Sequence, residues 1–137
     1  MGKIVFDQEL LGIMNLLNNL SRARIKDCFL EEDTYYVVVE KGDIGLMIGK
    51  GGMNIKKIKE ALRKSVKVIE YNDDPTRFVQ SLIHPVRVEE ISLEDKVVSI
   101  KGGDRKINGL LFGRDGKNIK LINKTVKRFF DVEVKIV

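Results

Sequence analysis

A segment of eight residues occurs twice in this chain, and this repeat limits the possible folds more than any other feature of the sequence. The first copy, 48–55, reads Ile-Gly-Lys-Gly-Gly-Met-Asn-Ile, and the second, 112–119, reads Phe-Gly-Arg-Asp-Gly-Lys-Asn-Ile, an offset of 64 residues. Each copy has an apolar residue followed by Gly-basic-x-Gly, and each leads into a basic amphipathic stretch. A repeat at this spacing in a chain of 137 residues predicts two small units of similar design.

The flanks of the two segments repeat in the same order. Each half has apolar residues at helical spacing, then two strand-like runs, a short helix before the glycines, a longer helix after them and a closing strand. The fold class is therefore α+β, with the order α-β-β-α-α-β in each half and a small three-stranded sheet packed by helices on one face. The predicted elements of the first half are a helix that starts near Asp7 and reaches Leu20, strands at Arg24–Leu30 and Thr34–Glu40, a helix at 53–64 and a strand at Val66–Tyr71.

The second half begins after a turn-rich junction. Asp74-Pro75 has the residue types of a helix N-cap followed by the first helical position, and His84-Pro85 is expected to end that helix. The domains are therefore expected at 1–73 and 74–137, and the short link is expected to hold the two units in a fixed orientation. The further predicted elements are strands at Val86–Glu90 and Lys96–Lys101, joined across Ser92–Asp95, a helix at 117–130 and a strand at Val132–Ile136.

Positive charge is concentrated beside the two glycine segments. The stretches 50–67 and 114–128 hold 13 of the 25 basic residues but only 2 of the 20 acidic ones. The net charge of +5 is weak evidence for a polyanionic partner, whereas this distribution favours local presentation of positive charge to nucleic acid.

The glycine segments have the composition of phosphate cradles. Glycines allow a tight turn and leave no Cβ in the way of an approaching backbone. The helix that follows directs its free N–H groups to the same place, and Lys50 or Arg114 adds a cation at the tip.

Residues 48–55 resemble the signature of KH domains, and the α-β-β-α-α-β order resembles the type II form of that fold. The run Gly42-Asp43-Ile44-Gly45-Leu46-Met47-Ile48 and the link Asp74-Pro75-x-x-Phe78-Val79 are similar to the tandem KH part of the NusA family of transcription elongation and termination factors, in its short, KH-only archaeal form. The resemblance implies two tandem type II KH domains that bind single-stranded RNA, with each Gly-x-x-Gly loop holding the backbone of about four nucleotides. It also implies RNA polymerase as a further partner.

The RNA-binding residues follow from the resemblance by position. On the strands, Val37 and Val39 would line the first base groove and Val98 and Ile100 the second, with alternation sending some of them to the opposite side. The candidate residues of the loops and their flanks are Ile48, Gly49, Lys50, Gly51, Gly52, Ile55 and Lys56 in the first half, and Phe112, Gly113, Arg114, Asp115, Gly116, Lys117 and Ile119 in the second.

The second copy departs from the family pattern at two positions. Asp115 places an acid beside the expected phosphate path, which either removes the grip of that loop or makes it weaker than the first. Phe112 stands where the family has an aliphatic residue, and it either stacks on a base or fills core. The segment between strand and loop, 104–112, is also three residues longer than its counterpart, 43–48, so an offset helix is expected.

Enzymatic and cofactor chemistry is disfavoured. The run from Gly45 to Gly51 is one residue short of a P-loop and lacks its Ser or Thr, which argues against nucleotide hydrolysis. His84 and Cys28 are the only residues of their kinds and fall in different elements, so a helix end and a buried thiol are the expected roles. The acidic run 31–33 is explained as well by solvated turn charges as by metal ligation. No catalytic residue, metal, cofactor or small-molecule substrate is therefore expected.

A cytoplasmic protein without a membrane contact is expected. The longest apolar run, Tyr35–Val39, is far too short to span a bilayer, and Asp7 and Glu9 interrupt any signal sequence. Two rival functions remain at this stage. One is a ribosome-associated or RNA-processing KH protein, and the other is a protein-interaction scaffold whose basic helices dock an acidic partner.

Overall fold

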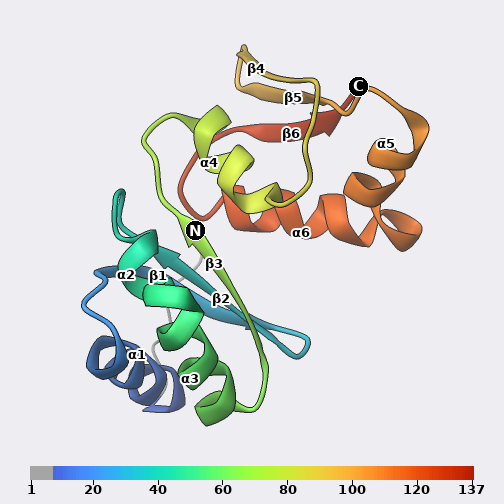
Figure 1. The fold of residues 1–137 in the computed structure, drawn as a ribbon. Helices are drawn as coiled ribbons and strands as arrows, with labels where there is room; N and C mark the ends of the chain where they lie inside the picture. The colour runs from blue at the N-terminus through green and yellow to red at the C-terminus, as the bar shows by residue number, and fades with distance from the viewer. Residues whose placement is uncertain (1–7) are drawn as a thin grey trace. The chain divides into compact units, whose positions relative to one another are not determined.

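The computed structural model describes residues 8–137, which form two compact units divided between Tyr71 and Asn72. Both units have the same order of elements, and in both the Gly-x-x-Gly segment joins a short helix to a longer one (Figure 1). The α+β class and the repeat of elements are confirmed. The predicted start of the first helix near Asp7 lies outside the described residues.

Unit 1 packs its helices on one face of a mixed sheet (Figure 1). The central strand is rich in β-branched and aromatic residues, which suit a pleated surface. It pairs antiparallel with the first strand and parallel with the third. The elements are α1 (Gln8–Leu20), β1 (Ile25–Glu31), β2 (Thr34–Val39), α2 (Ile44–Ile48), the 3-10 turn η1 (Lys50–Gly52), α3 (Met53–Leu62) and β3 (Ser65–Glu70).

Unit 2 repeats this sheet, with β5 between an antiparallel and a parallel neighbour. Helix α4 contacts β4 and α6, and α6 contacts β6 (Figure 1). The elements are α4 (Pro75–Ile83), β4 (Glu90–Glu94), β5 (Val97–Lys101), α5 (Arg105–Phe112), the 3-10 turn η2 (Arg114–Gly116), α6 (Lys117–Val126) and β6 (Glu133–Ile136).

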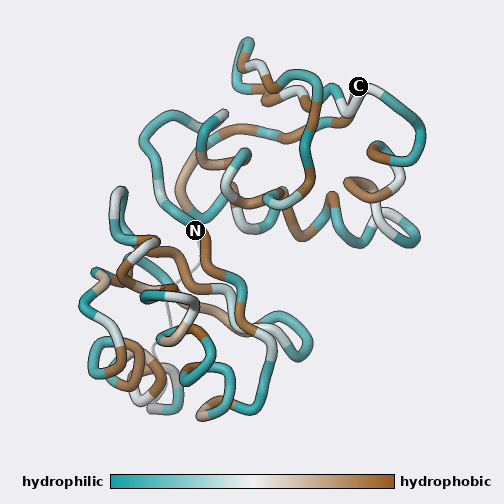
Figure 2. The backbone as a smooth tube through the Cα atoms, viewed as in Figure 1, coloured by the Kyte–Doolittle hydropathy of each residue, from teal (hydrophilic) through white to brown (hydrophobic). Residues whose placement is uncertain are grey.

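Each unit has its own core, which places the loop helices on the sheet. Leu17, Met47 and Ile58 come from the three helices of unit 1 and are fully buried with the central strand. In unit 2 the buried ring of Phe78 lies 5.3 Å from the ring of Phe129, centroid to centroid. Figure 2 shows the strands as largely hydrophobic and the turns between elements as hydrophilic.

The start of α4 confirms the predicted cap. Asp74 accepts a hydrogen bond from the Thr76 backbone N–H at 2.9 Å, and Pro75 occupies the first helical position. The helix ends at Ile83, directly before His84-Pro85, as expected.

Two predicted boundaries in unit 2 are wrong. The strand expected at Val86–Glu90 begins only at Glu90, because the hairpin turns at Asp95-Lys96, so that Ser92 to Glu94 pair with β5. Both turn residues have positive φ, 48° and 62°, which is the two-residue turn whose twist suits antiparallel strands. The helix expected at 117–130 ends at Val126.

Candidate nucleic-acid interface

The two Gly-x-x-Gly loops have the same backbone conformation. Gly49 and Gly113 begin the loops with φ of 80° and 76° and ψ of 169° and 176°. Gly52 and Gly116 end them in the left-handed region, with φ of 76° and 75°. Residues with side chains rarely adopt these angles, so the glycines are required by the turn itself.

Each loop is braced by an asparagine from the helix that follows. The Asn54 side chain donates from Nδ2 to the Leu46 carbonyl oxygen at 2.9 Å. Asn118 donates in the same way to Leu110 at 3.1 Å and to Leu111 at 3.0 Å. These bonds satisfy carbonyls at the end of the short helix, which has no further turn whose N–H groups could donate to them.

The bracing asparagine explains why the first position of the loop must be glycine. A Cβ on Gly49 would lie 2.7 Å from the Asn54 Cγ, and one on Gly113 would lie 2.6 Å from the Asn118 Cβ. The repeat in the sequence includes both asparagines, but their role as braces emerges only from the structure.

The third loop position differs in residue but not in backbone. Gly51 has φ 63° and ψ 21°, and Asp115 has φ 56° and ψ 28°. Aspartate is among the residues that tolerate this left-handed conformation. The second loop therefore keeps the cradle geometry and adds a carboxylate to it.

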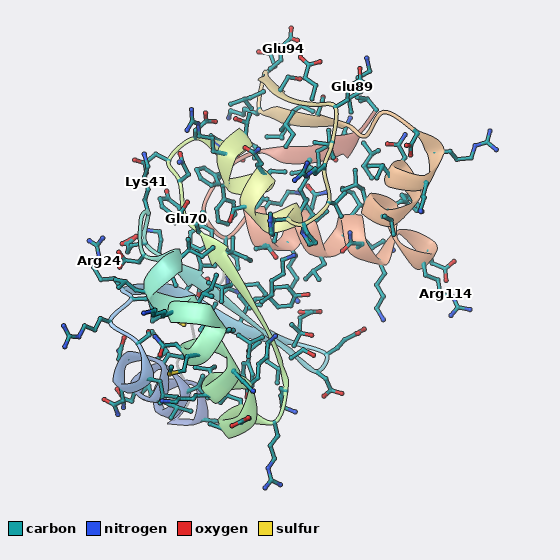
Figure 3. The ribbon with its side chains drawn as sticks, viewed as in Figure 1. Arg24, Lys41, Glu70, Glu89, Glu94 and Arg114 are labelled. Atoms are coloured by element: carbon teal, nitrogen blue, oxygen red, sulfur yellow. The ribbon has the colours of Figure 1, made fainter. Side chains whose placement is uncertain are left out.

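The structure brings the predicted loop residues together at one end of each unit. Figure 3 shows the side chain of Arg114 extending away from the ribbon at the tip between α5 and α6. The exposed members of the predicted set are Ile48, Lys50, Gly51, Lys56, Phe112, Arg114, Asp115 and Lys117, those of intermediate exposure are Gly49, Gly52, Ile55, Gly113 and Ile119, and Gly116 is buried.

Phe112 does not fill the core. Its side chain is in the exposed class, at 52% accessibility, and its ring lies against the last loop glycine, with Cζ 3.2 Å from the position of a Cβ on Gly116. The core interpretation of Phe112 is therefore wrong, and the aromatic ring remains available beside the loop.

The strand residues expected in the two base grooves are not available to a ligand. Val37, Val39, Val98 and Ile100 each have 0% accessibility. Val37 and Val39 pack in the core of unit 1 with Met47. The prediction that they line a groove is wrong, because the helices cover this side of the strands.

A glycine on the outer surface of each short helix was missed by the sequence analysis. Gly45 and Gly109 lie four residues before the first loop glycine, and a Cβ on either would meet nothing within 4 Å. Glycine in a helix costs about 1 kcal/mol relative to alanine, and no internal contact here requires it. Without a side chain at Gly45 or Gly109, the helix surface is flat next to Ile48 and Phe112, which lie one turn further along the helix. The offset of 64 residues was the signal that could have identified the pair.

The basic residues of α3 fall into separate groups. Lys56, Lys59 and Arg63 recur at helical spacing, are exposed and have no ion-pair partner among residues 8–137. Lys64 instead lies 3.5 Å from Asp33, nitrogen to oxygen. Of these, only Lys56 was singled out from the sequence, and it has a basic counterpart in unit 2, Lys120.

An ion pair between the exposed Arg24 and the largely buried Asp43 positions the start of α2. Asp43 accepts from the backbone N–H of Arg24 at 2.8 Å and from its Nε at 2.9 Å. These hydrogen bonds hold the pKa of the Asp43 carboxyl below its usual range and raise the pKa of the Arg24 guanidinium. The short helix before the first loop is thereby tied to the segment before β1. Figure 3 shows Arg24 at this edge of unit 1.

Residues 8–137 contain neither a membrane-spanning helix nor a cluster of metal-ligating side chains. None of the helices described there is long and apolar enough to cross a membrane. Within the same range there is no group of three or more His, Cys, Asp or Glu side chains placed to hold a metal ion.

Comparison with known proteins places this geometry in a family. A model of the KH domain matches residues 13–101. A protein of Methanocaldococcus jannaschii named "Probable transcription termination protein NusA" is 30% identical over all of this chain and 77% of its own length. A protein of the same name from Thermoplasma acidophilum is 29% identical, with 96% and 94% of the two chains covered. The crystal structure of APE1850 superimposes with a TM-score of 0.73 at 28% identity, covering 96% of this chain and 100% of that one.

Proposed function

Because this chain belongs to the KH-domain family and has NusA proteins among its relatives, we propose that it is a single-stranded RNA-binding factor of transcription elongation and termination. Its two units, with a boundary in the 71–74 link, act as tandem type II KH domains. The observation that carries the proposal is the pair of glycine loops with matching backbone angles, 64 residues apart, each with a cation at its tip.

Each loop holds the RNA backbone in two ways: its glycines carry no side chains, and the residue at its tip is positively charged. Lys50 and Arg114 are exposed and neutralise phosphates, while the glycines let the backbone approach closely. The flat helix surface at Gly45 and Gly109 leaves room for bases beside the apolar residue that precedes each loop. A KH domain holds about four nucleotides in this way.

The first loop is the stronger of the two. It carries no acid, and the exposed cations Lys56, Lys59 and Arg63 extend the positive surface along the helix behind it. In the second loop the Asp115 carboxylate repels the phosphates that Arg114 attracts. The function is binding rather than catalysis, and the chain holds RNA near RNA polymerase, its second partner.

A charge-reversal variant tests the cradle mechanism. Lys50→Asp, Gly51→Asp and Arg114→Asp are combined in the full chain, and binding of a short labelled single-stranded RNA of random sequence is followed by fluorescence anisotropy across a salt series. Single-stranded DNA and duplex RNA serve as comparison ligands. The parent should bind single-stranded RNA with log affinity falling linearly against log salt, and the variant should bind at least about tenfold more weakly, because the tip charges are reversed.

Two controls separate loss of binding from loss of fold. Asp115 already adopts the conformation that Gly51→Asp requires, so the variant should keep its thermal unfolding midpoint. Reversing two exposed lysines away from the loop tips, Lys41→Asp and Lys135→Asp, should change affinity much less. Equal affinity of the parent and the loop variant would remove the cradle mechanism.

A further inference from the structure

Unit 1 has a hollow of about 490 Å³ beside its glycine loop, on a side that the proposed RNA groove does not use. One wall is the end of α1 with the turn that follows it, which contributes Asn18, Asn19 and Arg22. The other wall comes from α2 and α3, which contribute Leu46 and Asn54. The volume lies within the range of about 300–1,000 Å³ that is common for small-molecule sites.

The hollow and the groove lie on opposite sides of α2. Leu46 and Ile48 are two residues apart, and successive residues of an α-helix are rotated by about 100°, so the two side chains point in opposite directions. Ile48 belongs to the proposed groove and Leu46 to the hollow. Both side chains are exposed, at 37% and 46% accessibility.

Three of the polar side chains of the hollow are not used by the fold. The side chains of Asn18, Asn19 and Arg22 are exposed, and none has a hydrogen bond or an ion pair to another described residue. Ser21, between them, differs, because its hydroxyl donates to the Leu17 carbonyl oxygen at 2.9 Å. These three residues line the hollow and carry two amides and a guanidinium with hydrogen-bonding capacity available.

Asn54 connects the hollow directly to the loop. Its Nδ2 is occupied by the Leu46 carbonyl oxygen, and its Cγ fills the space that a side chain at Gly49 would need. The same side chain thus supports the first loop glycine and lines the hollow. An RNA strand held by the loop has only to pass this asparagine to reach the hollow.

We propose that the hollow binds an unpaired nucleobase of the RNA that the first loop holds, outside the nucleotides in the groove. This inference rests on the proposed function. Asparagine amides offer donors and acceptors together, which matches the edge of a base, and a guanidinium stacks on its face. Leu46 supplies an apolar surface. A phosphate site would need more than the single cation, Arg22, that the hollow contains.

The test compares RNAs of two lengths in the full chain with the second loop disabled by Arg114→Asp. In this background, the affinities of a tetranucleotide and an octanucleotide report on unit 1 alone. Adding Asn19→Ala and Arg22→Ala should weaken octanucleotide binding by about 5- to 150-fold, the range for loss of one stacked or bidentate base contact, and should leave the tetranucleotide unchanged. Asn15→Ala with Lys41→Ala is the matched control, because both residues are exposed in unit 1 and neither lines the hollow.

An octanucleotide that lacks bases outside its central four positions identifies the group that is bound. This abasic RNA should bind the Arg114→Asp chain as weakly as the intact octanucleotide binds the same chain with Asn19→Ala and Arg22→Ala added. Those two substitutions should not change the affinity for the abasic RNA. A response of this abasic RNA to Arg22→Ala would overturn the base assignment, and equal octanucleotide affinity with and without the hollow substitutions would overturn the site. If neither the tetranucleotide nor the octanucleotide binds the Arg114→Asp chain, the proposed function is wrong, and the proposed base site fails with it. In that case Lys50→Asp should not change RNA binding either.

Discussion

Gly51 and Asp115 occupy the same position of the repeated loop, with φ values of 63° and 56°, so the chain itself provides a comparison of glycine and aspartate in one backbone conformation. The two loops differ there in charge and not in shape. Because nothing lies within 4 Å of a Cβ on Gly51, an aspartate can be placed there without a collision.

A reciprocal exchange at this position should shift affinity from one loop to the other. Gly51→Asp should weaken binding of single-stranded RNA by about three- to tenfold, and Asp115→Gly should strengthen it by a similar factor, because a carboxylate near a phosphate is repelled and a tenfold change corresponds to about 1.4 kcal/mol. Anisotropy titrations at low salt measure both, and the two effects should shrink as salt rises.

Asparagine at either position separates charge from conformation. It tolerates the left-handed region but carries no charge, so Gly51→Asn should bind nearly as well as the parent, and Asp115→Asn should bind as well as Asp115→Gly. If the asparagine variants behave like the aspartate ones, backbone conformation rather than charge separates the two loops.

At the scale of elements, the side chain of Asn123 links α6 to the edge of its sheet by hydrogen bonds. Asn123 donates from Nδ2 to the Val134 carbonyl oxygen at 3.0 Å and accepts from the Val134 N–H at 2.8 Å. Strand β6 lies at the edge of its sheet, so these bonds satisfy backbone groups that no neighbouring strand pairs with. They hold the helix that follows the second loop in register with the strand that closes unit 2.

Removal of this side chain should destabilise unit 2. Asn123→Ala should lower the free energy of unfolding by about 2–3 kcal/mol, because it deletes two hydrogen bonds and leaves two backbone groups of β6 without a partner. Urea denaturation followed by circular dichroism measures the change. Lys120→Ala, at an exposed position of the same helix, should change stability by less than about 0.5 kcal/mol, and an equally small effect of Asn123→Ala would show that the link contributes little.

The elements were predictable where local patterns determine them. The repeat placed both loops and their helices, and Asp74-Pro75 marked the start of α4, because caps and glycine turns depend on a few adjacent residues. The position of β4 was not predictable, because Asp95-Lys96 contains no glycine and still forms a two-residue turn. The burial of Val37 and Val39 depends on which face of the sheet the helices cover. The bracing asparagines and the hollow depend on contacts between elements, which spacing along the chain does not reveal.

At the scale of the whole molecule, only residues 71–74 lie between β3 and α4. The two units are therefore joined by a short tether. A strand bound by one loop therefore meets the second at a high effective concentration, in the millimolar range for short links, if both units bind RNA. Two weak cradles would then act as one stronger site on RNA that is long enough to reach both.

Tetranucleotide and longer RNA should therefore respond differently to loss of one loop. At saturation the full chain should bind two tetranucleotides, and Lys50→Asp with Gly51→Asp should leave one, so titration calorimetry should show the stoichiometry fall from two to one. A strand of about twelve nucleotides should bind the parent one to one. The single-loop variant should bind this strand at least about tenfold more weakly, because the intramolecular second contact is lost. The same affinity for the long strand in the parent and in Arg114→Asp would mean that unit 1 binds alone. The repeat would then preserve the KH fold in unit 2 without its grip on RNA.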